Sequence, residues 1–181
     1  MAWSAPMTAV TGNVFTAAQF NQHVRDNLNT TAPAQATTAG RILVATGANT
    51  VTERNPSVGY LDDEESTATT TYVDLATVGP SVTVTTGTKA MVTVGAGASN
   101  NTLGLASRVA AAVSGATTIA AADGDSYLEE SGNVDDQHQG TWTYITTALN
   151  AGSNTFTVKY RTSAGGGTST FSRRLVTVVP F

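Results

Sequence analysis

Cysteine and charge are both scarce in this chain. Cysteine is absent from its 181 residues, and Asp, Glu, Lys and Arg together make up 12% of them. Average globular proteins carry about 25% of these charged residues. Without cysteine the chain cannot form disulfides, Cys-type zinc sites or thiol nucleophiles. A Ser-His-Asp site needs a histidine. Of the two present, His23 is expected to pack or cap on a helix and His138 to lie in a polar loop, so we assign no catalytic residues.

Long apolar runs and an excess of basic residues are also missing. No apolar run approaches the ~20 residues that span a bilayer, and Thr8, Thr11 and Asn13 interrupt a signal-peptide-like start. The net charge of −4 argues against nucleic acid, whose phosphates bind clustered Lys and Arg. We therefore expect a cytosolic protein with no cofactor and with neither nucleic acid nor membrane as a partner.

Small and hydroxylated residues fill the gap that the missing charges leave. The chain has 33 Thr, 27 Ala and 17 Gly. Thr is β-branched and fits the pleated surface of a strand, so the composition favours β structure. Because Thr contributes less to a hydrophobic core than Val does, we also expect tight oligomerisation.

The first 30 residues contain the clearest helix signal. Thr16 and Gln19 have the spacing of a capping box, and Phe15 and Phe20 stand at the two positions of a hydrophobic staple. These signals predict a helix over roughly 17–28. A helix of this length is marginal in isolation, so it must pack against something else.

Residues 1–30 are accordingly predicted to be a docking arm and helix. Phe20, Val24 and Leu28 repeat every four residues and so form one apolar stripe. Trp3 precedes the helix as an aromatic anchor in an extended arm. The predicted docking contacts are Trp3, Phe15, Phe20, Val24 and Leu28.

Residues 31–66 have the composition of a linker. They begin with a Thr-, Ala- and Gly-rich stretch, and an apolar run at 41–45 followed by turn residues at 47–50 predicts a short strand pair. The acidic run Asp62–Glu65 is interpreted as a solvated boundary loop.

Residues 67–181 alternate strand-like segments with turn signals. In 155–161, Phe156, Val158 and Tyr160 fall on one face. The Ala-rich stretch 106–112 has helical propensity, but its neighbours favour a strand. About eight such segments predict a mainly β fold. We expect a C-terminal jelly-roll-like antiparallel β-sandwich with an N-terminal arm and one short helix.

One acidic region could hold a metal ion. Asp123, Asp125 and Glu129 belong to a stretch that holds six carboxylates and His138. The Asp-Gly-Asp spacing is typical of oxygen-ligand sites, but the regular ligand ladder of a calcium loop is missing. A polar loop at the rim of the sandwich is the favoured interpretation. Calcium is a weak alternative, a glycosidase pair a weaker one, and zinc is disfavoured.

Aromatic and basic residues near the C-terminus suggest a second type of site. Trp142, Tyr144 and Arg161 could form a platform for a glycan, although membership of the core is favoured for the aromatic side chains. Arg161 also belongs to a basic cluster with Arg173 and Arg174. For that cluster, pairing with Asp62–Glu65 across a subunit boundary is an equally open alternative to an acidic ligand.

The first residues and one later stretch resemble a known class of proteins. The segment beginning at Trp3 reads WSAPMTAVTGNVFTAAQFN and continues to the run VRDNL at 24–28. It resembles the N-terminal segment of many tailed-bacteriophage virion proteins, especially those of actinobacterial phages. Residues 39–50 resemble a short repeat of phage tail-fibre shafts, and 67–181 are similar in style to phage jelly-roll domains.

The resemblance implies a virion structural protein with no enzymatic role. Such appendages are commonly homotrimers whose N-terminal arms bind other virion proteins of the capsid or tail. Their β domains project from the virion surface, after synthesis in the host cytoplasm. The small size favours a capsid-decoration protein or head fibre over a long tail fibre, while a minor tail protein stays open. A host-attachment module that binds glycan, and a calcium-dependent or glycosidic enzyme, remain as alternatives.

Overall fold

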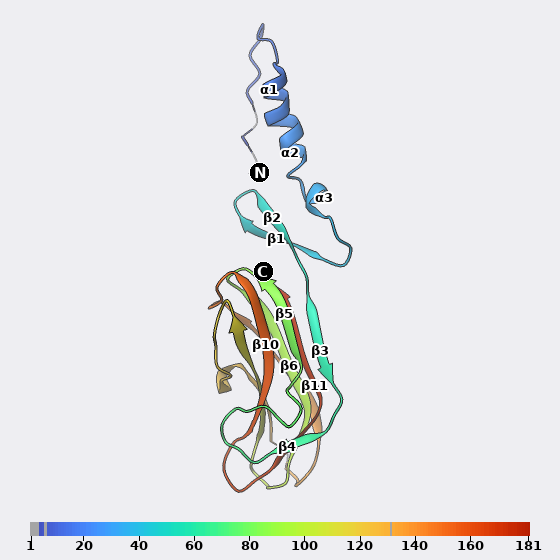
Figure 1. The fold of residues 1–181 in the computed structure, drawn as a ribbon, viewed down its shortest axis with the longest axis vertical. Coiled ribbons are helices and arrows are strands. Elements are labelled where there is room, and N and C mark those ends of the chain that lie inside the picture. The colour runs from blue at the N-terminus through green and yellow to red at the C-terminus, as the bar shows by residue number, and fades with distance from the viewer. Residues whose placement is uncertain (1–3, 6, 131) are drawn as a thin grey trace. The chain divides into compact units, whose positions relative to one another are not determined.

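The chain divides into two compact units, residues 1–55 together with 181, and residues 56–180. In the computed structural model the described residues are 4–5, 7–130 and 132–181. Each unit has its own construction (Figure 1).

A single continuous helix dominates the first unit. It consists of α1 (Ala17–Phe20), one π-helical turn η1 (Asn21–Arg25) and α2 (Asp26–Leu28). The Thr16 hydroxyl accepts a bond from the Gln19 amide, and the Gln19 side chain accepts one from the Thr16 amide. The rings of Phe15 and Phe20 meet edge to face at 6.1 Å. The helix predicted over 17–28 is therefore present, and it begins at the predicted capping box.

A short turn of helix and a hairpin complete the first unit. These are α3 (Ala32–Gln35), β1 (Ile42–Gly47) and β2 (Thr50–Arg54), with β1 and β2 paired antiparallel. The Glu53 carboxylate accepts bonds from the amides of Thr37 and Thr38, which attaches the preceding loop to the hairpin. The predicted strand pair is thus observed.

The second unit is a β-sandwich built from two antiparallel sheets (Figure 1). One sheet has the order β3-β11-β6-β9, and β4 pairs with β11 beyond β3; the other has the order β5-β10-β7-β8. This order is that of an eight-stranded jelly roll. The strands are β3 (Ser57–Leu61), β4 (Glu65–Thr67), β5 (Ser81–Thr86), β6 (Ala90–Asn100), β7 (Ser107–Gly115), β8 (Ser126–Glu129), β9 (His138–Thr146), β10 (Gly152–Thr162) and β11 (Ser169–Pro180). The predicted fold class is confirmed.

The sandwich starts earlier in the chain than the sequence pattern indicated. β3 pairs with β11 from Ser57 onward, so residues 57–66 belong to the sandwich and not to a linker. The acidic run 62–65 therefore connects two strands of the same sheet. The Ala-rich stretch 106–112 contributes to β7, as its β neighbours favoured.

Alternation along β5 and β10 separates the core from the outer face of their sheet. Along β10, Phe156, Val158 and Tyr160 are buried, as the sequence predicted, and the residues between them are only half-buried. Threonine side chains lie on the outer faces, where Thr83 meets Thr155 across two strands at 2.8 Å. Several threonines therefore form cross-strand hydroxyl pairs rather than core.

A β-bulge in β11 turns an arginine into the interior. The pairing with β6 shifts between Ser172 and Leu175, and Arg173 has a φ of 47°. Because the bulge changes the alternation, Arg174 is fully buried, with its guanidinium 5.6 Å from the centre of the Tyr160 ring.

Arg174 pairs with the acidic run of its own chain. Its ion pairs reach Glu65 at 3.4 Å and Asp63 at 3.9 Å. The Glu65 carboxylate also accepts bonds from the amide of Thr77, and these bonds lower the pKa of Glu65. The pairing between the basic cluster and residues 62–65 therefore exists within one chain, without a subunit boundary.

Candidate functional site

The first unit exposes most of its large apolar side chains. Val14 is 84% exposed, and Phe15 and Phe20 are each 48% exposed. Val10 and Leu28 are exposed as well, whereas Val24 is half-buried. Among the described residues up to Asn55, the only fully buried one is Asn27, which is polar. The predicted contact Trp3 lies outside the described residues.

A polar face of the helix, and not the predicted apolar stripe, packs within the chain. The Asn27 amide group accepts a bond from the Ser4 amide at 3.0 Å and donates one to the Ser4 carbonyl at 3.1 Å. His23 Nδ1 lies 3.1 Å from the Ala5 carbonyl oxygen. The returning arm thus covers the face formed by His23 and Asn27, which are four residues apart. Phe20 and Leu28 remain open to solvent.

The arm and the start of the helix enclose a hollow of about 330 Å³. Its lining is mostly apolar and comes from Met7, Thr8, Ala9, Val10, Asn13, Val14, Phe15 and Gln19. The exposed side chains and this hollow form what we call the arm–helix surface: residues 7–20 together with Leu28.

The proposed glycan platform is not assembled. Trp142 and Tyr144 lie on β9 opposite Val94 and Val92, so they point toward the core side of their sheet. Because β9 is an edge strand, Trp142 still leaves 46% of its surface exposed, while burial raises the pKa of Tyr144. Arg161 is on β10 of the other sheet and faces outward, since its neighbour Tyr160 faces inward. The platform prediction placed together residues that the two sheets separate.

Two of the three carboxylates of the weak calcium candidate have other partners. Asp123 bonds to Arg161, whereas Glu129 accepts bonds from Tyr127 and lies 2.8 Å from His138 Nδ1. Within residues 4–5, 7–130 and 132–181, there is no group of three His, Cys, Asp or Glu side chains that could hold a metal ion. The geometry therefore lends no support to a calcium site at Asp123, Asp125 and Glu129.

The outer face of the β5-β10-β7-β8 sheet carries a charged cluster at one end. Arg161 and Arg108 stand directly opposite each other on β10 and β7. Asp123 receives two bonds from Arg161, from Nε at 3.0 Å and from Nη2 at 2.5 Å, and lies 3.9 Å from Arg108 Nε. The bonds from Arg161 hold the pKa of Asp123 below its ordinary value. One carboxylate thus offsets the repulsion between two facing arginines.

A tyrosine joins this cluster from the loop before β5. The Tyr72 hydroxyl donates to Asp123 at 3.1 Å, and the Arg161 guanidinium lies over the Tyr72 ring, 5.4 Å from its centre. Burial raises the pKa of Tyr72, so its hydroxyl keeps its proton and stays a donor. Tyr72 and Asp123 are therefore each held by more than one contact.

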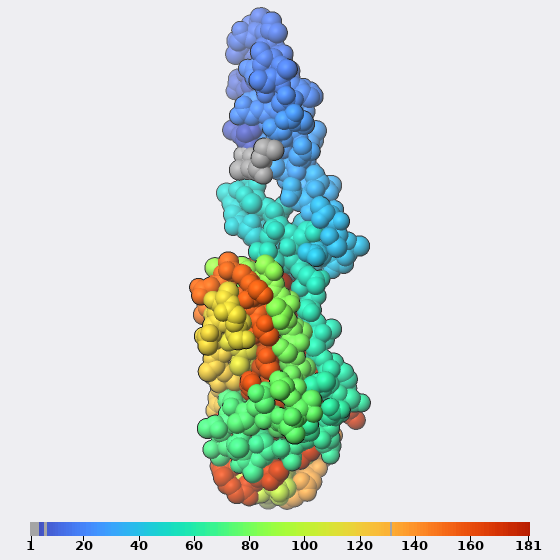
Figure 2. Space-filling view, in the orientation of Figure 1, coloured from blue at the N-terminus to red at the C-terminus, as the bar shows by residue number. Residues whose placement is uncertain are grey.

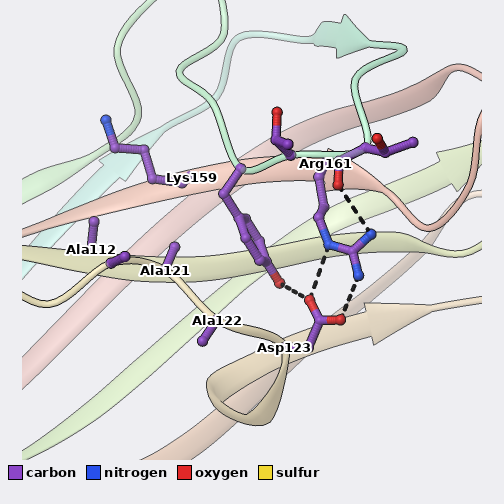
Figure 3. Close-up of a pocket in the computed structure, with 10 residues that line it drawn as sticks. Ala112, Ala121, Ala122, Asp123, Lys159 and Arg161 are labelled. Atoms are coloured by element: carbon purple, nitrogen blue, oxygen red, sulfur yellow. Dashed lines mark hydrogen bonds and ion pairs between the residues drawn. The ribbon is translucent and has the colours of Figure 1, made fainter.

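These residues border an open cleft of about 620 Å³, which we call the sheet-face cleft (Figure 3). Lys159 lies at one end of the close-up and Arg161 with Asp123 at the other, with Ala112 and Ala121 near Lys159. The lining consists of Thr70, Thr71, Tyr72, Ala112, Ala120, Ala121, Ala122, Asp123, Lys159 and Arg161. In the space-filling view, the segment before β5, in green, covers the lower part of this sheet face (Figure 2).

Sequence reasoning found two members of this cleft, Arg161 and Asp123, but assigned them to different sites. It missed Tyr72 and Lys159. The strand alternation already placed Lys159 on the same outer face as Arg161. Tyr72 gave no such signal, because it lies in an irregular loop.

In the part of the chain that the structure describes, no helix is both long enough and apolar enough to cross a bilayer.

No protein-family model matches the chain, and no curated protein matches it. Among solved structures, one similar chain is from the structure of infectious bursal disease virus Gt strain, with 12% sequence identity and a TM-score of 0.33. The match covers 76% of this chain and 35% of the viral one.

Proposed function

We propose that this chain is a structural protein of a tailed-bacteriophage virion, attached to the particle through residues 1–30 and displaying the jelly-roll unit at the virion surface. The observation that carries the proposal is the contrast between the two units. The jelly roll buries a private core that includes Phe156, Tyr160 and Phe171. The first unit buries only Asn27 among its described residues and exposes its large apolar side chains.

The free energy gained by burying apolar side chains explains why this contrast favours docking. Burying a side chain of the size of Phe or Val contributes about 1.5–3 kcal/mol. In the first unit, much of this stabilisation is missing because five large apolar side chains are exposed: Val10, Val14, Phe15, Phe20 and Leu28. Val10, Val14 and Phe15 line one hollow and Phe20 packs against Phe15, and a grouping of exposed apolar side chains of this kind marks an interaction site. The resemblance of residues 3–28 to phage virion proteins supports the phage particle as the partner.

We further propose that the protein is a homotrimer and that it decorates the capsid or forms a short head fibre. Association of three first units would bury apolar surface that one copy leaves exposed. A minor tail or tail-fibre position is the alternative within the same class. Native mass spectrometry of the purified full chain tests the oligomeric state: trimer is expected, and a monomer at micromolar concentration would remove this part of the proposal.

Particle incorporation tests the docking role directly. Phages lacking the gene for this chain would be grown with the wild-type chain or with Phe20→Ser supplied in trans, and copies per purified particle would be counted. We expect Phe20→Ser to lower incorporation by about tenfold, the change that ~1.4 kcal/mol produces. The side chain is half-exposed, so the substitution leaves the fold of the helix largely intact.

A matched control separates docking from a general loss of apolar surface. Leu103 is 62% exposed in a loop of the jelly roll, outside the arm–helix surface. Leu103→Ser is expected to incorporate at the wild-type level. If Phe20→Ser and a chain without residues 2–30 are both incorporated as well as the wild type, the docking role is refuted.

A further inference from the structure

The sheet-face cleft is unusual within its own sheet. Elsewhere on this outer face the cross-strand contacts are hydroxyl pairs, such as Ser81 with Thr157 at 3.0 Å. At the end of this face that holds the cleft, the outward residues include Arg108, Lys159 and Arg161, which are three of the nine Lys and Arg residues in the chain. A chain that uses charge so sparingly gathers a third of its cations on one end of one sheet face.

The floor of the cleft is apolar and free of long side chains. It is formed by Ala112 on β7 and by Ala120, Ala121 and Ala122 in the segment before η2 (Asp123–Asp125) (Figure 3). Tyr72 stands beside this floor, and the Arg161 guanidinium lies over its ring. An apolar floor next to an aromatic ring suits the apolar C–H face of a sugar ring.

The charged groups at the ends of the cleft are already paired. Lys159 donates to both carboxylate oxygens of Asp74 at 2.6 and 2.7 Å, and Arg161 donates to both oxygens of Asp123. An anionic ligand at these cations would lie close to the carboxylates of Asp74 and Asp123, which repel it. A hydroxyl group is both donor and acceptor, so it can bond to a cation and a carboxylate together without breaking either pair. Paired charges therefore favour an uncharged polyol over an anion.

We propose that the sheet-face cleft is a carbohydrate-binding site for an uncharged pyranose. The ring lies against Tyr72 and the alanine floor, and its hydroxyls bond to the Lys159–Asp74 and Arg161–Asp123 pairs. A volume of about 620 Å³ lies within the range of about 300–1,000 Å³ that is typical of small-molecule sites. Because none of these residues belongs to the arm–helix surface, this site does not depend on the docking function.

An NMR titration of the full chain tests the site. The probes are the methyl pyranosides of glucose, galactose, mannose and N-acetylglucosamine, with sodium sulfate as the anion probe. At least one glycoside is expected to produce saturable shifts of amide signals at 70–72, 120–123 and 159–161, in the millimolar range because the cleft is open. If no glycoside shifts these signals, or if sulfate alone shifts them, the proposal is overturned.

Substitutions assign the binding to individual groups. Tyr72→Ala removes the ring and is expected to abolish the shifts, whereas Lys159→Met keeps the Arg161–Asp123 pair and is expected to weaken binding at least fivefold. Tyr60→Ala is the matched control, because Tyr60 is a 54% exposed tyrosine on the other sheet. If the NMR spectrum of Tyr72→Ala shows that this variant does not fold, the glycoside affinity of Lys159→Met tests the site instead. Unchanged affinity in Lys159→Met, or equal loss in Tyr60→Ala, contradicts the site.

Discussion

Arg161 and Asp123 form a two-point ion pair that joins β10 to the turn before β8. Two bonds link the residues, at 3.0 and 2.5 Å, although 38 positions separate them in the chain. The side chain of Arg161 is only 12% exposed, while that of Asp123 is 50% exposed. The pair therefore holds the η2 turn over the outer face of the sheet and sets one end of the sheet-face cleft.

The first prediction concerns the titration of Asp123. In the wild type its pKa lies below the ordinary value of 3.8, mainly because Arg161 donates hydrogen bonds to the ionised form. In Arg161→Met the pKa is expected to rise toward that ordinary value. Carboxyl carbon NMR across pH 2 to 6 measures it, and Arg173→Met serves as the control that leaves the pKa unchanged. An unshifted pKa in Arg161→Met would show that the pair is not formed in solution.

The same pair gives a pH dependence of stability. Because the folded-state pKa of Asp123 is lower than the unfolded one, its stabilising effect is present above about pH 4 and is lost as the pH falls through the folded-state pKa. The melting temperature of Asp123→Asn should therefore lie below that of the wild type at pH 6, and the two should converge near pH 2. A constant difference across this range would contradict the assignment.

Stability also depends on the arginine inside the sandwich. Arg174 has no exposed surface and pairs with Glu65, so Arg174→Ala should lower the free energy of unfolding by about 3 kcal/mol. Urea unfolding of the full chain measures this change. Arg173→Ala changes the exposed neighbour in the same bulge and should stay within about 0.5 kcal/mol of the wild type. Equal effects of the two substitutions would argue against a buried role for Arg174.

Close backbone packing gives a third stability prediction. A Cβ atom at Gly95 on β6 would lie 2.5 Å from the carbonyl oxygen of Gly140 on β9. Gly95→Ala should therefore cost about 1–3 kcal/mol, because backbone on one of the two strands has to move. Gly124→Ala is the control, since a Cβ atom there meets nothing within 4 Å. Thermal unfolding compares the two variants, and equal melting temperatures would contradict the close approach of β6 and β9 at this position.

The arm of the first unit provides the last prediction. Asn27 makes bonds to the amide, the hydroxyl and the carbonyl of Ser4. Asn27→Ala should release the arm and speed hydrogen exchange of the Ser4 amide by about tenfold, the effect of losing ~1.4 kcal/mol. Asn29→Ala changes an exposed asparagine just beyond α2 and should leave that exchange rate as it is. Unaltered exchange in Asn27→Ala would mean that the arm is held by other contacts.

Local signals in the sequence determined the secondary structure well. The Thr16–Gln19 capping box fixed the start of the helix because its two hydrogen bonds involve only neighbouring residues. The alternation in 155–161 fixed which side chains of β10 face the core, since successive strand residues point to opposite faces. From these signals the mainly β fold and its jelly-roll class could be predicted.

Tertiary structure decided which residues come together at the sheet-face cleft. Trp142 and Arg161 fell into one predicted platform because both lie near the C-terminus, yet β9 and β10 enter different sheets. Tyr72 and Asp123 come together only because the fold brings a loop before β5 across the outer face of β10. Pairings over such distances in the chain leave no local pattern, so periodicity and spacing cannot reveal them.

The few charged residues illustrate the separate contributions of sequence and of tertiary structure. The sequence by itself determined that few charged residues exist, that cysteine chemistry is absent and that threonine-rich strands dominate. Only the tertiary structure decided where the few charges lie: Arg174 inside the sandwich, and Lys159 with Arg161 on one outer face. The physical reason is that composition and alternation are properties of single segments. The bulge at Arg173 and the neighbours of each strand are set by packing two sheets together.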